Sequence, residues 1–269
     1  MNIHETAIVH PKAKIGKRTT VGPWVIIEAG AEIGAECEIR ARAVITGNVR
    51  MGKKNQVGYG AIIGAEPQDL AFKGVPSFVE IGDNNIFREY TTIHRGTKEN
   101  TATKIGDNNF FMAGVHVAHN CAIGNHAILV NNVLLGGYVT VQDRAFLGGA
   151  VVVHQYTRIG QLAMIRGQTR IGMDVPPFFM AVATNAVCGL NRVGLKRAGY
   201  TPQQRKAILR AYQTLYHQGL NRQQALEKFS TDPELQTPEV KLIRDFLTST
   251  QRGICHAIQA NDAKGSEED

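Results

Sequence analysis

The sequence lacks any long hydrophobic run. Hydrophobic residues make up 43% of its 269 positions, yet no stretch approaches the roughly eighteen consecutive apolar residues of a membrane-spanning helix. The first residues, Met1-Asn2-Ile3-His4-Glu5, contain no basic segment followed by an apolar one, as a secretory leader would. We therefore expect a cytoplasmic protein without a transmembrane segment.

Cysteine and the common catalytic motifs are scarce too. The four cysteines, Cys37, Cys121, Cys188 and Cys255, are far apart and form no CxxC pair, which argues against a zinc ribbon or a dithiol redox site. We expect reduced thiols. The sequence has no serine nucleophile elbow, no phosphate-binding glycine loop and no dinucleotide fingerprint. We expect neither a metal nor a cofactor.

Aromatic residues are few, at 7%, whereas the net charge is +7. Between Arg192 and Arg252 basic residues outnumber acidic ones, but without the interleaved aromatic side chains that stack on nucleic-acid bases. An acidic protein or an anionic small molecule is the better match for this charge, and we expect no nucleic-acid partner. The chain ends in an acidic stretch, and residues 258–269 are predicted to be a disordered tail.

A six-residue repeat is the dominant feature. An apolar residue falls at every sixth position from Ile3 to Ile171, and the register is broken by Asp69 and Glu99. A period of six does not match the 3.6 residues of a helical turn. The register positions are Ile3, Val9, Ile15, Val21, Ile27, Ile33, Ile39, Ile45, Met51, Val57, Ile63, Val75, Ile81, Phe87, Ile93, Ile105, Phe111, Val117, Ile123, Leu129, Leu135, Val141, Leu147, Val153, Ile159, Ile165 and Ile171.

This repeat predicts a parallel β-helix. Glycine often follows the register residue, as at Gly16 and Gly34, and we expect it at corners because it accepts backbone conformations that a β-carbon forbids. A small residue usually lies two positions before the register residue. Three such segments per turn make a triangular prism in which residues eighteen apart are neighbours, about 4.8 Å from each other. The two breaks predict loops at about residues 65–80 and 94–104.

The six-residue pattern stops after Val175-Pro176-Pro177, and helix signals follow. Thr201-Pro202-Gln203-Gln204 is typical of an N-cap with proline at the first helical position. Further helices should begin after Asn221 and Thr237. We predict a β-helix over residues 1–190 and an α-helical domain over 191–257 that caps the unpaired strands at the end of the prism.

The repeat directs several histidines outward. His116 and His119 flank the inward Val117, and His94, His126 and His154 should also point out of the prism. Four converging zinc ligands are not evident. An imidazole acting as a general base in a groove between subunits is the chemistry that these positions favour, against the alternative of solvated surface histidines.

The ordered motifs closely resemble the UDP-N-acetylglucosamine O-acyltransferase family, which begins lipid A synthesis. The similarity covers essentially the whole chain. It rests on the hexads together with Gln68-Asp69-Leu70, Thr92-Ile93-His94-Arg95-Gly96-Thr97, His116-Val117-Ala118-His119, Val153-His154-Gln155, Asp174-Val175-Pro176-Pro177 and Gly194-Leu195-Lys196-Arg197.

The resemblance implies a left-handed β-helix and a homotrimer with sites between subunits. It also implies transfer of a 3-hydroxyacyl group from acyl carrier protein to the glucosamine 3-hydroxyl of UDP-N-acetylglucosamine. His119 would be the general base and the Gly137 N–H the oxyanion donor. The other residues that the resemblance implies are Asp69, His116, Tyr138, His154, Gln155, Asn191 and Arg197 at the sugar nucleotide, and Met164 and Gly167 at the acyl chain.

Several positions depart from the family pattern. Ala71 stands where a lysine is frequent, Tyr138 where a sugar-contacting histidine is, Val193 at an acidic position, Ala198 at the position of a second arginine, and Asn120 where aspartate often follows the catalytic histidine. These departures leave two alternatives open. The acceptor could be a different UDP-amino sugar, such as a 3-amino analogue, or the chain could be a non-catalytic paralogue that only binds.

Overall fold

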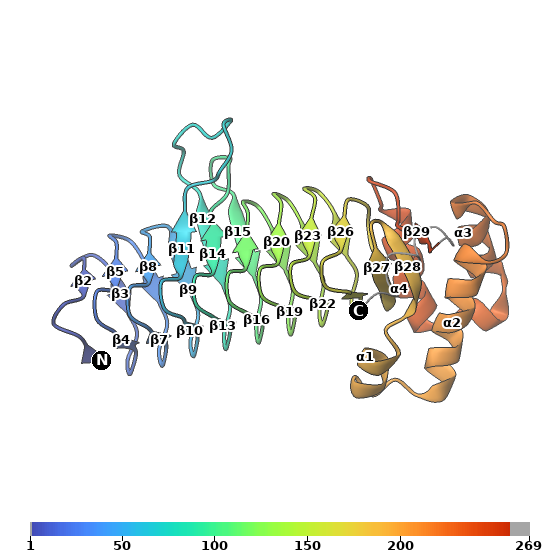
Figure 1. Cartoon of the computed structure of the whole chain (residues 1–269), viewed down its shortest axis with the longest axis horizontal. Coiled ribbons are helices and arrows are strands. Elements are labelled where there is room, and N and C mark those ends of the chain that lie inside the picture. Colours follow the sequence, from blue (N-terminus) through green and yellow to red (C-terminus); the bar gives the residue numbers. More distant parts are fainter. Residues whose placement is uncertain (1, 259–269) are drawn as a thin grey trace.

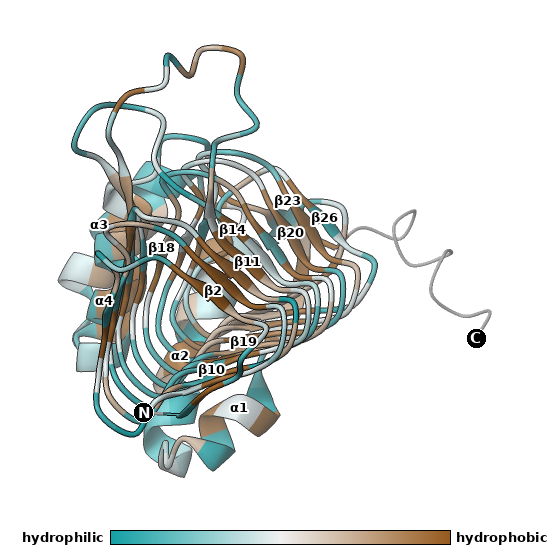
Figure 2. Ribbon diagram, turned by 90° about the vertical axis from the view of Figure 1, so that its left-hand side faces the viewer, coloured by the Kyte–Doolittle hydropathy of each residue, from teal (hydrophilic) through white to brown (hydrophobic). Residues whose placement is uncertain are grey.

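The computed structural model describes residues 2–258. Except for Ile258, the predicted disordered tail lies outside the described residues. The chain forms a left-handed parallel β-helix followed by a small α-helical domain, and the helices gather at the C-terminal end of the prism (Figure 1). Seen along its length, the prism is triangular (Figure 2). Its left-handed winding departs from the right-handed rule for parallel strand crossovers.

Three sheets form the sides of the prism, and we call them sheets A, B and C. Sheet A holds β1 (Asn2–Ile3), β4 (Thr20–Val21), β7 (Glu38–Ile39), β10 (Gln56–Val57), β13 (Ile86–Phe87), β16 (Phe110–Phe111), β19 (Ile128–Leu129), β22 (Phe146–Leu147), β25 (Met164–Ile165), β27 (Phe179–Ala183), β28 (Ala186–Leu190) and β29 (His256–Ala257). Sheet B holds β2 (Ile8–Val9), β5 (Ile26–Ile27), β8 (Val44–Ile45), β11 (Ile62–Ala65), β14 (Thr92–His94), β17 (His116–Val117), β20 (Leu134–Leu135), β23 (Val152–Val153) and β26 (Arg170–Ile171). Sheet C holds β3 (Lys14–Ile15), β6 (Glu32–Ile33), β9 (Val49–Met51), β12 (Phe78–Ile81), β15 (Ala102–Ile105), β18 (Ala122–Ile123), β21 (Thr140–Val141) and β24 (Arg158–Ile159).

The predicted register is confirmed. Residues eighteen apart pair in parallel, as Val117 does with Leu135 and Leu135 with Val153. The register residues from Val21 onward are buried, except in the first loop, where Val75 is half-buried. Ile3, Val9 and Ile15 are only half-buried because they belong to the first, terminal coil. These buried residues form one apolar stack on each side of the prism, and their burial is the main stabilising contribution to the fold.

The reason that we gave for the repeated glycines was wrong for part of the set. Gly16 and Gly34 do not have the positive φ that would require glycine. Instead, a β-carbon at Gly16 would lie 2.4 Å from the backbone nitrogen of Ala35, and one at Gly34 would lie 2.4 Å from the Gly52 carbonyl. The close approach of successive coils therefore selects glycine at these positions.

A ladder of asparagines runs inside the prism at the corner between sheets C and A. Asn55, Asn85 and Asn109 are buried, and the Asn85 side-chain amide donates to the Asn55 Oδ1 atom at 3.0 Å. The backbone N–H groups of Asn85 and Asn109 donate to the Oδ1 atoms one coil below, at 2.8 and 2.9 Å. Since an unpaired buried amide costs about 1–3 kcal/mol, this ladder fixes the stacking of the coils.

Two loops leave the prism between strands of sheets B and C. The first connects β11 to β12 over residues 66–77, and the second connects β14 to β15 over residues 95–101. Together they form the projection beside β11, β12 and β14 in Figure 1. The two interruptions of the register, Asp69 and Glu99, lie in these loops.

The C-terminal part begins with a hairpin that the sequence did not reveal. The strands β27 and β28 pair antiparallel and extend sheet A past its last coil. The helices α1 (Arg192–Arg197), α2 (Pro202–Tyr216), α3 (Arg222–Thr231) and α4 (Pro238–Thr248) follow, with a short 3₁₀ helix at Pro233–Leu235. The predicted N-caps Thr201, Asn221 and Thr237 are confirmed, whereas α1 was not predicted.

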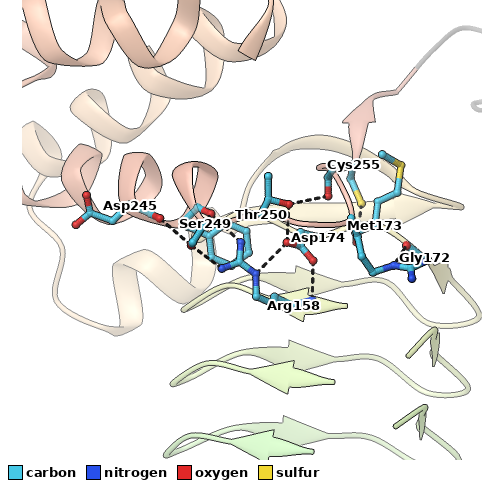
Figure 3. A network of polar contacts seen from close by, with 11 residues as sticks. Arg158, Gly172, Met173, Asp174, Asp245, Ser249, Thr250 and Cys255 are labelled. Atoms are coloured by element: carbon cyan, nitrogen blue, oxygen red, sulfur yellow. Dashed lines mark hydrogen bonds and ion pairs between the residues drawn. The ribbon is translucent and has the colours of Figure 1, made fainter. Parts of the chain in front are cut away.

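A buried ion pair joins the helices to the prism. Asp174 is 1% exposed and accepts hydrogen bonds from the Arg158 backbone N–H at 2.8 Å and from its Nε atom at 2.9 Å (Figure 3). The same guanidinium donates to the Ser249 hydroxyl and to the Phe246 carbonyl of α4. Thr250 donates to Asp174 at 2.7 Å. The last strand of sheet C is thereby tied to the end of α4.

Among residues 2–258, no helix combines the length and the apolar character that a bilayer span requires.

Candidate active site

The predicted catalytic residues lie at the corner where sheet B turns into sheet C. His119 follows β17, and its backbone carbonyl accepts from the Tyr138 N–H one coil further along, at 3.0 Å. The Gly137 carbonyl accepts from the Tyr156 N–H in the same way. Because residues eighteen apart stack, the repeat itself aligns His119, Gly137 and the segment near Gln155 along one corner.

His119 is enclosed, with 8% of its surface exposed, and both ring nitrogens face defined groups. The Nδ1 atom lies 3.1 Å from the Asn120 Oδ1 atom. The Nε2 atom lies 3.6 Å from the Asp69 Oδ2 atom on the first loop. The Tyr138 ring meets the imidazole edge on, with centroids 5.3 Å apart. Nε2 therefore faces the carboxylate that the first loop carries.

Gly137 has a specific reason to be glycine. A β-carbon there would lie 2.3 Å from the Cε1 atom of His119 and 2.5 Å from its Nε2 atom. The missing side chain lets the imidazole lie directly against the backbone. Within the part of the chain that the structure describes, no acceptor pairs with the Gly137 N–H. A backbone N–H without a partner is suited to an oxyanion, because it is a fixed dipole in a partly enclosed site.

Asp69 is held by the backbone of its own loop. Its Oδ1 atom accepts from the Ala71 N–H at 2.8 Å, which leaves Oδ2 directed toward His119. This contact uses the main chain of residue 71, so it does not depend on the lysine that is frequent at that position. Loop 66–77 thus supplies a carboxylate to the corner without help from a cationic side chain.

His116 and His94 form a second pair beside the corner. The His116 Nδ1 atom lies 2.8 Å from the Thr92 hydroxyl, and its ring meets that of His94 edge on at 4.9 Å. We expected both to point out of the prism, without predicting their burial: His94 is only 6% exposed and His116 is half-buried. They leave the prism as predicted and are then covered by the loops, whose fold the register cannot specify.

His154 and Gln155 lie one coil beyond the glycine corner and are exposed. The Gly136 N–H donates to the Val153 carbonyl, and a β-carbon at Gly136 would lie 2.8 Å from the Gln155 backbone nitrogen. Within the chain, the Nδ1 atom of His154 lies 3.1 Å from the carbonyl of Gln155. Both side chains therefore extend the corner group and remain open to a ligand.

The other predicted residues lie on sheet A and α1. A cleft of about 480 Å³ there is lined by Ile128, Phe146, Met164, Asn191 and Arg197, among others. Its apolar floor is compatible with an acyl chain. Gly167 lies past Met164 at the next corner, where a β-carbon would lie 3.0 Å from the Gly149 carbonyl.

Asn191 has a structural role beside this cleft as the N-cap of α1. Its Oδ1 atom accepts from the Gly194 N–H at 2.9 Å and caps α1, and its amide donates to the Leu162 carbonyl at 2.9 Å. Arg197, in the last turn of α1, is exposed and is free to meet an anionic group. Asn191 therefore positions the helix that presents Arg197.

The two groups of predicted residues do not meet within one chain. The corner between sheets B and C is opposite sheet A in a triangular prism, and the aliphatic core lies between them (Figure 2). The first group is Asp69, His116, His119, Gly137, Tyr138, His154 and Gln155. The second group is Met164, Gly167, Asn191 and Arg197. A single site that uses both groups requires two copies of the chain.

Sequence reasoning missed two structural features of the corner. Thr97, on the second loop, binds the Asn120 side chain through its backbone N–H at 2.9 Å and its hydroxyl at 3.0 Å. Tyr156 stacks on Tyr138, with centroids 4.8 Å apart and planes at 9°. The eighteen-residue spacing of the two tyrosines was the signal available for the stack. No comparable signal placed the loop residue Thr97.

Within residues 2–258, no three side chains among histidine, cysteine, aspartate and glutamate are arranged to hold a metal ion, and all four cysteines are free.

Comparison with known proteins identifies similar chains over nearly the full length. Residues 174–255 match the family model described as UDP N-acetylglucosamine O-acyltransferase, domain 2. Residues 12–47 and 102–137 match the bacterial transferase hexapeptide model. The acyl-[acyl-carrier-protein]–UDP-N-acetylglucosamine O-acyltransferases of Thermodesulfovibrio yellowstonii and Saccharophagus degradans are 43% and 46% identical. Each alignment covers 94% of this chain and 98% of the relative.

Solved structures agree with this similarity. The UDP-N-acetylglucosamine acyltransferase of Francisella novicida is 37% identical with a TM-score of 0.91, and 99% of each chain is covered. That of Bacteroides fragilis is 40% identical with the same TM-score, and covers 93% of this chain and 98% of its own.

The buried His94 predicts a pH-dependent stability. Burial, with smaller contributions from His116 and His119, lowers the pKa of His94 from 6.5 to about 4. Between these values the unfolded chain binds the proton better, so the contribution is complete above pH 6.5 and is lost as the pH falls toward 4. His94→Gln should flatten this decline in denaturant titrations at fixed protein concentration. The exposed His154→Gln is the control, and an unchanged slope in His94→Gln would contradict the assignment.

Proposed function

This chain belongs to the family of UDP-N-acetylglucosamine O-acyltransferases, and we propose that it moves a 3-hydroxyacyl group from acyl carrier protein to the glucosamine 3-hydroxyl of UDP-N-acetylglucosamine. This reaction is the first step of lipid A biosynthesis. The observation that carries the proposal is the 43–46% identity to relatives of this name over 94% of the chain. Neither a different UDP-amino sugar nor a non-catalytic role is favoured by these relatives.

His119 is the general base in the proposed mechanism. The neutral Nε2 atom takes the proton of the sugar hydroxyl while the hydroxyl oxygen attacks the thioester carbonyl carbon. The carbon–sulfur bond then breaks, and the imidazolium returns the proton to the leaving thiolate. A sugar hydroxyl is too weak an acid to attack unaided, and a positioned base contributes roughly 10²–10⁴-fold. The enclosed imidazole, 3.6 Å from Asp69, supports this role.

The Gly137 N–H stabilises the negative charge that develops on the thioester oxygen. Two observations support this role: the His119 ring occupies the position that a β-carbon at Gly137 would take, and no acceptor within the described residues pairs with the Gly137 N–H. Asp69, His116, Tyr138, His154 and Gln155 are proposed to bind the sugar nucleotide. Asn191 and Arg197 are assigned to the uridine diphosphate, and Met164 and Gly167 to the acyl chain.

His119→Ala tests the mechanism. We expect kcat to fall by roughly 10²–10⁴-fold with little change in the affinity for UDP-N-acetylglucosamine, because the sugar retains its other contacts. Acyl transfer from 3-hydroxyacyl carrier protein would be measured alongside equilibrium binding of the sugar nucleotide. A His119→Ala variant that keeps near wild-type kcat would refute the general-base role.

We propose that the working form is a homotrimer in which sheet A of one copy faces sheet B of the next. The outer positions of sheet A include Ile86, Phe110, Ile128, Phe146 and Met164, and those of sheet B include Ile8, Ile26, Ile62, Leu134 and Val152. Such apolar faces are typical of surfaces that are covered in an assembly. A contact between two different faces closes into a ring of three when each copy is rotated by about 120° from the next. It would also bring the two groups of site residues together.

Sheet C has the opposite character and is proposed to face solvent. Along its outer side Lys14, Glu32, Arg50, Glu80 and Lys104 alternate in charge from coil to coil. Lys14 lies 2.7 Å from Glu32, and Glu80 lies 3.7 Å from Arg50 and 3.6 Å from Lys104. Exposed ion pairs of this kind contribute little stability, but they keep this side hydrated.

Disrupting sheet B should separate the subunits. We expect Ile26→Glu with Val44→Glu to give a smaller species in analytical ultracentrifugation, because charges would be buried unpaired at the contact. The pair lies several coils away from His119, so loss of acyl transfer would follow from loss of assembly. Ala122→Glu, on the outer side of sheet C, is the control and should stay assembled. A double variant with unchanged mass would contradict the proposed interface.

The basic helical domain is proposed to dock acyl carrier protein. Arg197 and Lys206 are exposed and free to meet an acidic partner, and such charges mainly govern encounter and specificity. Arg205, beside Lys206, instead donates from its guanidinium to the Tyr200 carbonyl at 2.8 Å. We also propose that the enzyme is cytoplasmic. The four free cysteines and the expected substrates, acyl carrier protein and UDP-N-acetylglucosamine, support this location.

Charge reversal tests the docking surface. Arg197→Glu with Lys206→Glu should weaken binding of acyl carrier protein on the order of tenfold at low salt, and the difference should shrink at high salt because screening weakens exposed charges. Binding would be followed by titration calorimetry. Lys12→Glu, at the other end of the prism, is the matched control. Equal affinity of the double variant and the control at low salt would place the docking surface elsewhere.

A further inference from the structure

Three hydrogen bonds converge on one side-chain oxygen beside the proposed base. The Oδ1 atom of Asn120 lies 2.9 Å from the Thr97 backbone nitrogen, 3.0 Å from the Thr97 hydroxyl and 3.1 Å from the His119 Nδ1 atom. The second loop and the corner of the prism are joined here. Thr97 and Asn120 have no role in the mechanism proposed above.

The two donors of Thr97, its backbone N–H and its hydroxyl, together hold the oxygen end of the Asn120 amide toward His119. An N–H group can only donate, so the atom that it meets must be the carbonyl oxygen and not the amide nitrogen. A carbonyl oxygen can only accept, so the His119 Nδ1 atom must carry a proton in the neutral ring. The Asp69 carboxylate is the other acceptor near the ring, but at 3.6 Å from Nε2 it is beyond hydrogen-bond distance. The lone pair of the neutral imidazole is therefore on Nε2.

The remaining proton positions follow from the same rule. The Thr97 hydroxyl has one proton, and it must be donated to Asn120 because the carbonyl oxygen has none to give. The Tyr138 hydroxyl, 3.1 Å from the Thr97 oxygen, is then the donor to Thr97. Tyr138 itself is fixed by its stack on Tyr156. The hydrogen bonds thus run from Tyr138 to Thr97 and from Thr97 to the Asn120 oxygen, which also accepts from the His119 Nδ1–H.

An asparagine needs this arrangement where an aspartate would not. Both oxygens of a carboxylate accept, so either one would hold Nδ1–H. An Asn120 amide turned by 180° would present its NH₂ group to Nδ1, which would then have to accept. The ring proton would be on Nε2, and Nε2 would have no lone pair to accept a proton from the substrate. A turned amide would also place its NH₂ group against the Thr97 backbone N–H, leaving two donors facing each other.

We propose that Thr97 is a positioning residue that fixes the amide of Asn120 and thereby the reactive tautomer of His119, with Tyr138 holding the Thr97 hydroxyl. The inference rests on the proposed function in that His119 is the base. The tautomer itself is a property of the protein without substrate. It can therefore be tested whether or not acyl transfer is observed.

The first experiment is spectroscopic. In protein labelled with ¹⁵N-histidine, the His119 signals, assigned by their loss in His119→Ala, should show Nδ1 protonated and Nε2 unprotonated at neutral pH. Thr97→Val removes the hydroxyl and keeps the shape, and it should introduce a detectable fraction of the other tautomer. Thr97→Ser should restore the wild-type spectrum. Wild-type protein with Nε2 protonated, or an unaltered spectrum in Thr97→Val, would overturn the proposal.

The second experiment is kinetic and separates positioning from general structural damage. Thr97→Val should lower kcat on the order of tenfold and leave the KM for the sugar nucleotide unchanged, and Thr97→Ser should recover most of the rate. In an Asn120→Asp background the same Thr97→Val change should cost less than about twofold, because either carboxylate oxygen accepts. An equal loss in both backgrounds would show that Thr97 only supports the loop.

Tyr138→Phe provides a variant that retains the aromatic stack in case Thr97→Val fails to fold. It deletes the donor to Thr97, and we expect a smaller loss of kcat in the same direction together with the same spectral change. Should the wild-type protein prove inactive, the proposed function fails while the spectra still decide the role of Thr97. An active protein with a single unaltered tautomer in Tyr138→Phe and Thr97→Val leaves the proposed function intact and refutes this inference.

Discussion

Stacking of one large apolar residue per side of the prism is the constraint on which the rest of the structure depends. Each coil must place its inward residue over the one eighteen positions earlier, as Val117, Leu135 and Val153 do. The outward positions between them are then fixed as well, without any contact of their own. Function can be assigned to these outward positions because their spacing is maintained by the core and not by the side chains that use it.

The interruptions of the repeat determine where the two loops leave the prism, and therefore which side chains the loops bring to the site. A loop can leave the prism only where the register is suspended, and both loops do so between sheets B and C. They return over the corner that carries His119 and bring Asp69 and Thr97 to it. A rigid corner supplies the imidazole and the glycine backbone, and the loops supply the groups that enclose and orient them. Sheet A, on the far side of the core, provides the acyl cleft to a neighbouring copy in the proposed trimer.

The sequence predicted the parts of this arrangement that repeat. The register predicted the three faces of the prism and the outward direction of the histidines, and capping signals predicted the starts of α2, α3 and α4. It did not give the burial of His94 or the contact between Thr97 and Asn120, since both depend on how the loops fold back. The cap at Asn191 was missed because α1 has only six residues and follows an unpredicted hairpin.

Two departures from the family pattern, Ala71 and Asn120, are explained by hydrogen-bond geometry that takes the place of a charged side chain. Ala71 holds Asp69 through a backbone N–H, which any residue except proline supplies, so a lysine at this position is not needed to orient the carboxylate. Asn120 offers the imidazole no charge, and an amide orients a ring only if its own direction is fixed. The loop threonine and Tyr138 supply that direction. The neutral partner of Nδ1 therefore orients the ring through hydrogen-bond geometry and not through charge.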